Sequence, residues 1–212
     1  AAQLQCDLVF AQDIVQLDYQ YEGYDVYQQG TLWLEGLAPD LKGRYQEKNL
    51  PGVLTAILVL KELGYEIPDP AVKEGIGRTA SLTGLKGRWQ IIRDEPLTIC
   101  DTGHNEAGIR AVVEQLHNLP HHKLHLVIGL VNDKDASTIL NLLPMDGVYY
   151  FCQAKIPRAM EARQLAEEAA EEGLTGIVVP DVKTALKKAT LAAGPQDVVF
   201  VGGSTFVVGE LD

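Results

Sequence analysis

From Trp89 onward, short continuous runs of Val, Ile, Leu and aromatic residues alternate with stretches whose apolar residues recur three and four positions apart. Continuous runs are typical of parallel strands buried on both faces, and the wider spacing is typical of helices that cover them. The pattern predicts an α/β fold with a mostly parallel, Rossmann-like sheet. The predicted strands are 91–92 and 97–100, joined by a tight loop, then 124–130, 148–152, 176–179, 198–201 and a return strand 206–208; the predicted helices are 105–116, 136–143, 159–172 and 182–193.

The first third of the chain has a different pattern. Its predicted elements are strands at 8–10, 24–27 and 31–34 and helices at 51–63 and 70–77. Three strands are too few for a stable sheet of their own. We therefore interpret residues 1–84 as the C-terminal part of a domain that begins upstream of Ala1, and residues 85–212 as a second, whole α/β domain.

Polar residues follow the predicted strands at their carboxyl ends, where ligands gather in such sheets. Asp101 and His104 come directly after strand 97–100 and precede a helix that begins near Asn105. Helix capping accounts equally well for the later acidic residues in such loops, but two titratable groups in one loop exceed what a cap requires. The later loop residues are Asn132, Asp133, Lys134, Asp135, Pro157, Arg158, Asp181, Gly202, Gly203 and Ser204.

Composition and charge exclude several classes of protein. The formal net charge of -11 argues against a nucleic-acid surface, which needs clustered Lys and Arg. No apolar run reaches the roughly 18 residues of a membrane span. Cys6, Cys100 and Cys152 lie far apart, which suits buried core thiols in a reducing compartment, so we expect a cytoplasmic protein. We interpret four further histidines as solvated loop residues rather than metal ligands: His117, His121, His122 and His125.

Common nucleotide and hydrolase motifs are absent from the sequence. It contains no Gly-x-Gly-x-x-Gly after a strand, no Gly-x-x-x-x-Gly-Lys-Ser/Thr phosphate loop, and no Gly-x-Ser-x-Gly elbow. These absences leave the sequence without a dinucleotide fingerprint, a phosphate loop or the most familiar hydrolase motif.

Two short motifs resemble a known family. Gly87-Arg88-Trp89-Gln90 followed by Asp101-Thr102-Gly103-His104-Asn105 is similar to the Gly-Arg-(Phe/Trp) and Asp-Gly-Ala-His-Asn pair of the folylpolyglutamate synthase and dihydrofolate synthase family, within the Mur ligase superfamily. Thr102, Gly103 and Glu106 depart from the family pattern. Further matches occur in the family's order at 46–49, at Gly129 with 133–135, at 157–159 and at 202–204.

The resemblance implies that residues 1–84 end a central ATP-binding domain and that 85–212 form the C-terminal ligase domain. It also implies ATP-dependent transfer of L-glutamate to a folate or dihydropteroate carboxylate through an acyl phosphate. The cofactors implied are ATP and Mg²⁺, with the phosphate loop, the metal ligands and a modified lysine upstream of Ala1, so no metal ligands are expected in this chain. We expect the chain alone to be inactive, and the whole protein to be a monomer.

By the same resemblance, Asn49 contacts the adenine side of ATP, Arg88 its phosphates, and Asp101 the nucleotide. His104 binds the carboxylate of the incoming glutamate or takes a proton from its amine, and Ser204 belongs to the same substrate site. Simpler explanations exist for three of these residues. Arg88 would be a solvated hinge residue, Asn49 a helix N-cap, and Ser204 a turn residue in a hairpin.

Two alternatives remain open on the sequence. One is another Mur-type ligase that acts on a cell-wall precursor, and the other is a non-catalytic nucleotide- or amino-acid-binding α/β module. The sequence also does not distinguish a folylpolyglutamate synthase from a dihydrofolate synthase or an enzyme with both activities.

Overall fold

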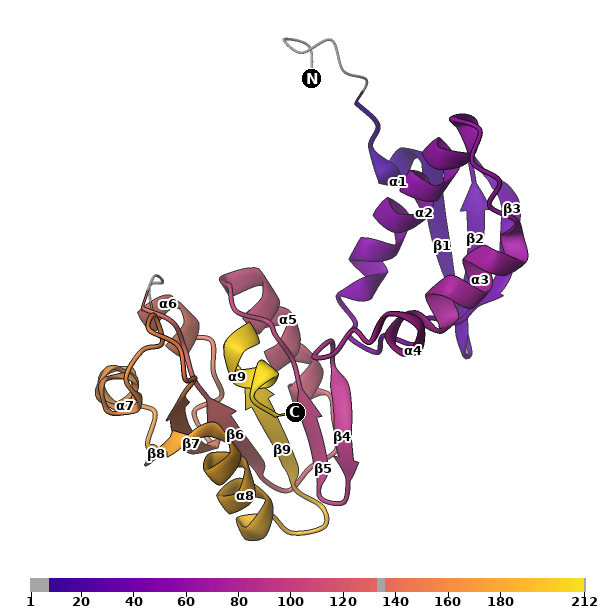
Figure 1. Cartoon of the computed structure of the whole chain (residues 1–212). Coiled ribbons are helices and arrows are strands. Elements are labelled where there is room, and N and C mark those ends of the chain that lie inside the picture. The colour runs from indigo at the N-terminus through magenta and orange to yellow at the C-terminus, as the bar shows by residue number, and fades with distance from the viewer. Residues whose placement is uncertain (1–7, 133–135, 212) are drawn as a thin grey trace. The chain divides into compact units, whose positions relative to one another are not determined.

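The structure, a computed structural model, describes residues 8–132 and 136–211 and divides the chain into two compact units (Figure 1). The first unit covers residues 1–85 and the second covers 86–212. This division lies one residue from the predicted boundary between 84 and 85.

The second unit contains the predicted α/β sheet. Its six strands lie in the order β4-β5-β9-β6-β7-β8. All neighbours pair in parallel except β4 and β5, which form an antiparallel hairpin at one edge. The prediction of a mostly parallel sheet is confirmed. The strands are β4 (Gln90–Asp94), β5 (Leu97–Cys100), β6 (Leu124–Ile128), β7 (Val148–Gln153), β8 (Gly176–Asp181) and β9 (Val198–Gly202).

Helices cover both faces of this sheet. The central strand β6 is apolar except for His125, because successive side chains point to opposite faces of the sheet and both faces are buried. Leu126 belongs to the core beneath α5, α6 and α7, whereas Val127 belongs to the core beneath α8 and α9. The helices are α5 (Glu106–His117), α6 (Ala136–Leu140), α7 (Ala162–Glu171), α8 (Val182–Ala192) and α9 (Thr205–Gly209).

The predicted return strand 206–208 is wrong, because these residues lie in helix α9. The Ser204 hydroxyl accepts a hydrogen bond from the backbone N–H of Phe206 at 3.2 Å and so caps the helix. Val207 and Val208 are then buried against the same face of the sheet as α8. The β-branched pair favours a strand by local propensity, but tertiary burial overrides that preference.

The first unit is an antiparallel meander with helices packed on one side. Its strands β1 (Val15–Gln20), β2 (Gly23–Gln28) and β3 (Thr31–Leu37) pair in sequence order. Val26, Leu34, Leu54 and Val72 form part of a core shared by the strands and two helices. The helices are α1 (Ala11–Ile14), α2 (Gln46–Glu62), α3 (Asp69–Gly77) and α4 (Thr79–Thr83).

Two sequence predictions for this unit need correction. Residues 8–10 are not a strand, and the first strand is β1, whose alternating Val15, Leu17 and Tyr19 gave a weaker signal than the apolar run before it. Helix α2 begins at Gln46 rather than near Pro51, which lies inside the helix. Proline is commonest at the first helical position, and this preference placed the predicted start too late.

Candidate functional site

Three segments of the second unit meet where the parallel strands β5 and β9 end. They are the loop 101–105 after β5, the loop 203–204 after β9, and residues 87–89 before β4, which we call the arginine turn. The two strands are neighbours, and the Asp101 N–H donates to the Val201 carbonyl at 3.1 Å. Pairing of the strands therefore brings four residues together at the carboxyl ends of β5 and β9: Arg88, Asp101, His104 and Ser204.

Asp101 joins two of these segments. Its carboxylate accepts from the Trp89 N–H at 2.7 Å through Oδ2 and from the Gly103 N–H at 2.7 Å through Oδ1. The residue is only 1% exposed. Asp101 thus anchors the arginine turn to the loop after β5.

The arginine turn has a backbone that only particular residues tolerate. Gly87 has φ +70° and Trp89 has φ +52°. A Cβ added to Gly87 would lie 2.6 Å from Thr102 Cγ2 and 2.8 Å from Val208 Cγ1, so a glycine is required there. The N–H of Gly87 donates to Gln90 Oε1 at 2.9 Å. Arg88 is half-buried on this turn.

His104 lies at the exposed side of the same loop. Its Nδ1 is 3.0 Å from the Thr102 carbonyl oxygen. Because a carbonyl only accepts, Nδ1 carries the hydrogen, and a neutral ring then has its lone pair on Nε2. The next residue, Asn105, caps α5 by accepting from the Gly108 N–H at 2.8 Å. The cap fixes the backbone that carries the imidazole.

Ser204 is a helix cap rather than a hairpin-turn residue, so that alternative explanation is wrong. It is 2% exposed and stands at the N-cap of α9. Its oxygen accepts from the Phe206 N–H, and the hydroxyl hydrogen can still be donated.

Arg158 also lies at these loops, although the sequence analysis did not assign it a role in the site. Its guanidinium lies 4.6 Å from the centre of the Phe206 ring, next to the Ser204 cap. Its carbonyl accepts from the Asn132 N–H at 2.9 Å, and Val131 pairs with Ala159 in an antiparallel bridge. The loops after β6, β7 and β9 are therefore joined. The only sequence signal was the short match at 157–159.

Asn49 belongs to the first unit, and its position is described within that unit alone. It is exposed in the first turn of α2, and its Nδ2 donates to Gln46 Oε1 at 2.9 Å. The residue at the N-cap position is Tyr45, so the alternative that Asn49 caps the helix is wrong.

Of the three other acidic residues in these loops, the structure describes only Asp181. Asp181 is the N-cap of α8 and also forms an ion pair with Lys155 at 2.9 Å. The hydroxyl and N–H of Thr184 and the Lys155 ammonium lower the pKa of this carboxyl. For Asp181 the capping explanation holds. Asp133 and Asp135 lie outside the described residues.

The described parts of the chain lack both a cluster of metal ligands and a membrane-spanning helix. Within 8–132 and 136–211 there is no group of three or more His, Cys, Asp or Glu side chains that could hold a metal ion. Among the same residues, no helix is long and apolar enough to cross a membrane. Cys100 and Cys152 are buried as predicted, and burial raises the pKa of the Cys152 thiol to about 12. Cys6 lies outside the described residues.

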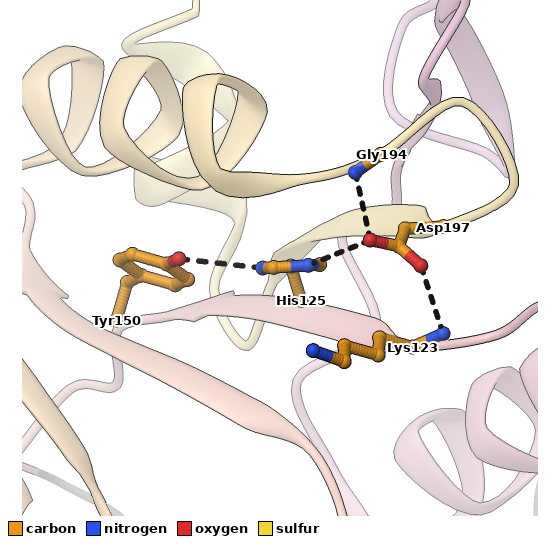
Figure 2. A network of polar contacts seen from close by, with 5 residues as sticks. All are labelled: Lys123, His125, Tyr150, Gly194 and Asp197. Atoms are coloured by element: carbon orange, nitrogen blue, oxygen red, sulfur yellow. Dashed lines mark hydrogen bonds and ion pairs between the residues drawn. The ribbon is translucent and has the colours of Figure 1, made fainter.

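A second polar network lies near the amino-terminal ends of β6 and β9, at the opposite end of the strands from the candidate site. It shows that the prediction of His125 as a solvated loop residue is wrong. Figure 2 shows the side chains of Tyr150, His125 and Asp197 in a row. His125 is 3% exposed, with Nδ1 3.3 Å from the Tyr150 hydroxyl and Nε2 3.4 Å from Asp197 Oδ2. Asp197 also accepts from the N–H groups of Gly194 at 2.7 Å and Lys123 at 3.0 Å. This network joins β6 to the turn before β9 and is remote from the candidate site along the strands.

We expect Asp197→Asn to lower the free energy of unfolding by about 1–3 kcal/mol at pH 7, because a charged acceptor of two part-buried N–H groups is lost. The N–H of Gly194 is the first cause that lowers the pKa of Asp197, opposed by burial and assisted by His125 and Lys123. A carboxyl whose pKa is lower in the folded than in the unfolded state stabilises the fold at pH values above its unfolded pKa. This stabilisation disappears as the pH falls through the pKa of the folded state.

Urea unfolding of the 212-residue chain at several pH values measures this effect. The difference between wild type and Asp197→Asn should shrink as the solution is acidified. Asp94→Asn, at an exposed position of β4, is the matched control and should remain within about 0.5 kcal/mol of wild type. A difference that stays constant with pH would show that the ionised carboxylate is not the source of the effect.

Comparison with known proteins gives one family and consistent relatives. Residues 87–205 match the family described as Mur ligase, glutamate ligase domain. The chain is 30% identical over 160 residues to the dihydrofolate synthase/folylpolyglutamate synthase of Escherichia coli K12. The alignment covers 74% of this chain and 36% of that relative.

Two solved structures have the same fold. E. coli FolC in complex with DHPP and ADP aligns with a TM-score of 0.74 at 26% identity, covering 92% of this chain and 44% of that one. A bifunctional folylpolyglutamate synthase/dihydrofolate synthase with Mn, AMPPNP and L-glutamate bound aligns with a TM-score of 0.74 at 29% identity, covering 93% and 45%. The chain therefore spans less than half the length of these relatives.

Proposed function

Because this chain belongs to the family of Mur ligase glutamate ligase domains, we propose that it is part of an ATP-dependent ligase that adds L-glutamate to a folate or dihydropteroate carboxylate. The observation that carries the proposal is that hydrogen bonds hold the arginine turn against the loop of Asp101 and His104, at the carboxyl end of β5. The relatives favour this function over a cell-wall ligase and over a non-catalytic module, because both structures and the E. coli protein carry folate ligase names.

The domain assignment is part of the same proposal. Residues 1–84 form the C-terminal part of a central ATP-binding domain, and residues 85–212 form the C-terminal ligase domain. Three exposed apolar residues support the first assignment: Val53 and Leu60 of α2 are 47% and 38% exposed, and Leu63 at the C-cap of α2 is 71% exposed. Further polypeptide of the same domain would cover them, and the relatives are more than twice as long as this chain.

The proposed reaction makes an amide in two steps. An oxygen of the acceptor carboxylate attacks the γ-phosphorus of ATP, and ADP leaves. The amine nitrogen of glutamate then attacks the acyl carbon, the bond to phosphate breaks, and the amine loses a proton. Both steps develop charge that positive and hydrogen-bonding groups must stabilise. Mg²⁺ neutralises phosphate charge in such reactions, and its ligands would come from polypeptide other than the described residues.

The chain's own residues would act on the two substrates. Arg88 would bind the phosphates from a fixed turn, with Asp101 and Asn49 on the nucleotide as well. His104 would bind the glutamate carboxylate as an imidazolium or accept the amine proton at Nε2 as a neutral ring. Ser204 would donate its hydroxyl hydrogen to glutamate. Arg158, held against Phe206, is a further cation for a glutamate carboxylate.

The properties of the whole protein follow from the proposal. We assign it to the cytoplasm as a monomer that acts on small molecules, without nucleic-acid or membrane partners. ATP and a divalent cation, Mg²⁺ in the cell, would be its cofactors.

The experiment that tests the function compares the 212-residue chain with the full-length protein that contains it. The full-length protein should release ADP only when glutamate and either tetrahydrofolate or dihydropteroate are present together. The isolated chain should show no ligase activity and no tight Mg²⁺-dependent binding of ATP by calorimetry, since it lacks a phosphate loop. Tight ATP binding by the chain, or turnover with a uridine-linked cell-wall precursor instead of a folate, would contradict the proposal.

A further inference from the structure

Thr102 contacts the backbone of the arginine turn through two donors. Its N–H donates to the Gly87 carbonyl at 2.9 Å, and its hydroxyl donates to the same oxygen at 3.1 Å. Thr102 is 5% exposed. Its Cγ2 methyl packs against Gly87, where an added Cβ would lie 2.6 Å away. The side chain therefore has two separable contacts, one polar and one apolar.

These two donors fill the acceptor capacity of the Gly87 carbonyl, because a carbonyl oxygen has two lone pairs. Arg88 Nη1 also donates to the same oxygen, but at 3.5 Å this third hydrogen bond is long and weak. A charged guanidinium is a stronger donor than a hydroxyl. If the hydroxyl were removed, the guanidinium would therefore take the vacated lone pair, the long contact would shorten, and Arg88 would be held more tightly against its own turn.

We propose that Thr102 is a positioning residue for Arg88: its hydroxyl occupies the Gly87 carbonyl and so keeps the guanidinium available for the phosphate of a nucleotide. The kinetic consequence rests on the proposed function, because it requires Arg88 to bind phosphate. The competition between the Thr102 hydroxyl and the Arg88 guanidinium for the Gly87 carbonyl is a property of the fold and does not depend on the proposed function.

Two substitutions in the full-length enzyme separate the two contacts. Thr102→Val keeps the methyl groups and the volume but removes the hydroxyl, whereas Thr102→Ser keeps the hydroxyl and removes the methyl. We expect Thr102→Val to raise KM for ATP about fivefold with kcat changed less than about twofold, the factor that one neutral hydrogen bond supplies. Thr102→Ser should keep the wild-type KM. If Thr102 were merely structural, KM would follow the melting temperature of each variant rather than the hydroxyl.

A second readout follows the guanidinium directly. In the 212-residue chain, side-chain NMR signals of Arg88 should show slowed rotation of the Nη groups in Thr102→Val and not in Thr102→Ser, because only the first variant frees the carbonyl. Slowed rotation together with a raised KM for ATP supports the inference.

Two results would overturn it, and they are distinguishable. If Arg88→Ala raises KM for ATP but Thr102→Val does not, Thr102 does not position Arg88, while the proposed function stands. If neither substitution changes KM for ATP, Arg88 does not bind phosphate, and the inference fails together with that part of the proposed function.

Discussion

Replacing Arg88 by alanine is expected to lower kcat/KM for ATP by about 10²–10³, the loss typical of one preorganised donor to developing charge. The guanidinium is carried on a turn whose two flanking residues, Gly87 and Trp89, both have positive φ. Backbone contacts from Asp101 and Thr102 hold that turn. A fixed arginine loses little conformational freedom when it binds a phosphate, so its removal affects nucleotide binding strongly.

Steady-state assays of the full-length protein with varied ATP measure the effect of Arg88→Ala. Arg88→Lys should recover only part of the loss, since an ammonium cannot make the bidentate contact. Arg93→Ala, at an exposed position of β4 in the same unit, is the control and should remain within about twofold of wild type. The melting temperature of Arg88→Ala should be close to that of wild type. An unchanged kcat/KM would remove Arg88 from the nucleotide site.

His104→Ala is expected to lower kcat by about 10²–10⁴ if the imidazole takes the proton of the attacking amine. The hydrogen bond from Nδ1 to the Thr102 carbonyl orients the ring and leaves the lone pair of a neutral ring on Nε2. If the ring instead binds the glutamate carboxylate, KM for glutamate rises more than kcat falls. Varying glutamate at saturating ATP therefore separates the two roles.

Added imidazole gives a further test, because it should restore part of the activity of His104→Ala only in the proton-transfer case. His122→Ala, an exposed histidine of the same unit, serves as the control. Wild-type kcat and KM in His104→Ala would exclude this residue from the site.

The sequence predicted the sheet well because burial on both faces leaves a direct trace in composition. Residues 124–128 are all buried, and their run of residues, apolar except for His125, identified a central strand. The prediction failed where the local pattern was ambiguous. Val207 and Val208 favoured a strand, yet the Ser204 cap and the packing of α9 made a helix. In the first unit, the run at 8–10 was more apolar than β1 but has no paired neighbour among the described strands.

In the candidate site too, the sequence revealed features of neighbouring residues but not contacts between distant segments. The short motifs gave four candidate residues, which strand pairing brings together at the carboxyl ends of β5 and β9: Arg88, Asp101, His104 and Ser204. The sequence could not reveal that the Asp101 carboxylate accepts from a residue 12 positions away, or that Thr102 occupies a carbonyl 15 positions away. It also placed His125 among solvated histidines, although partners on β7 and before β9 bury it.

The sequence by itself determined the α/β architecture and the order of the motif residues, because periodic burial and short motifs are properties of neighbouring residues. Only the tertiary structure decided which donors and acceptors meet, and so that Asp101 and Thr102 hold the turn that carries Arg88. Hydrogen bonds between segments depend on strand order and helix packing, which no local pattern in the chain encodes.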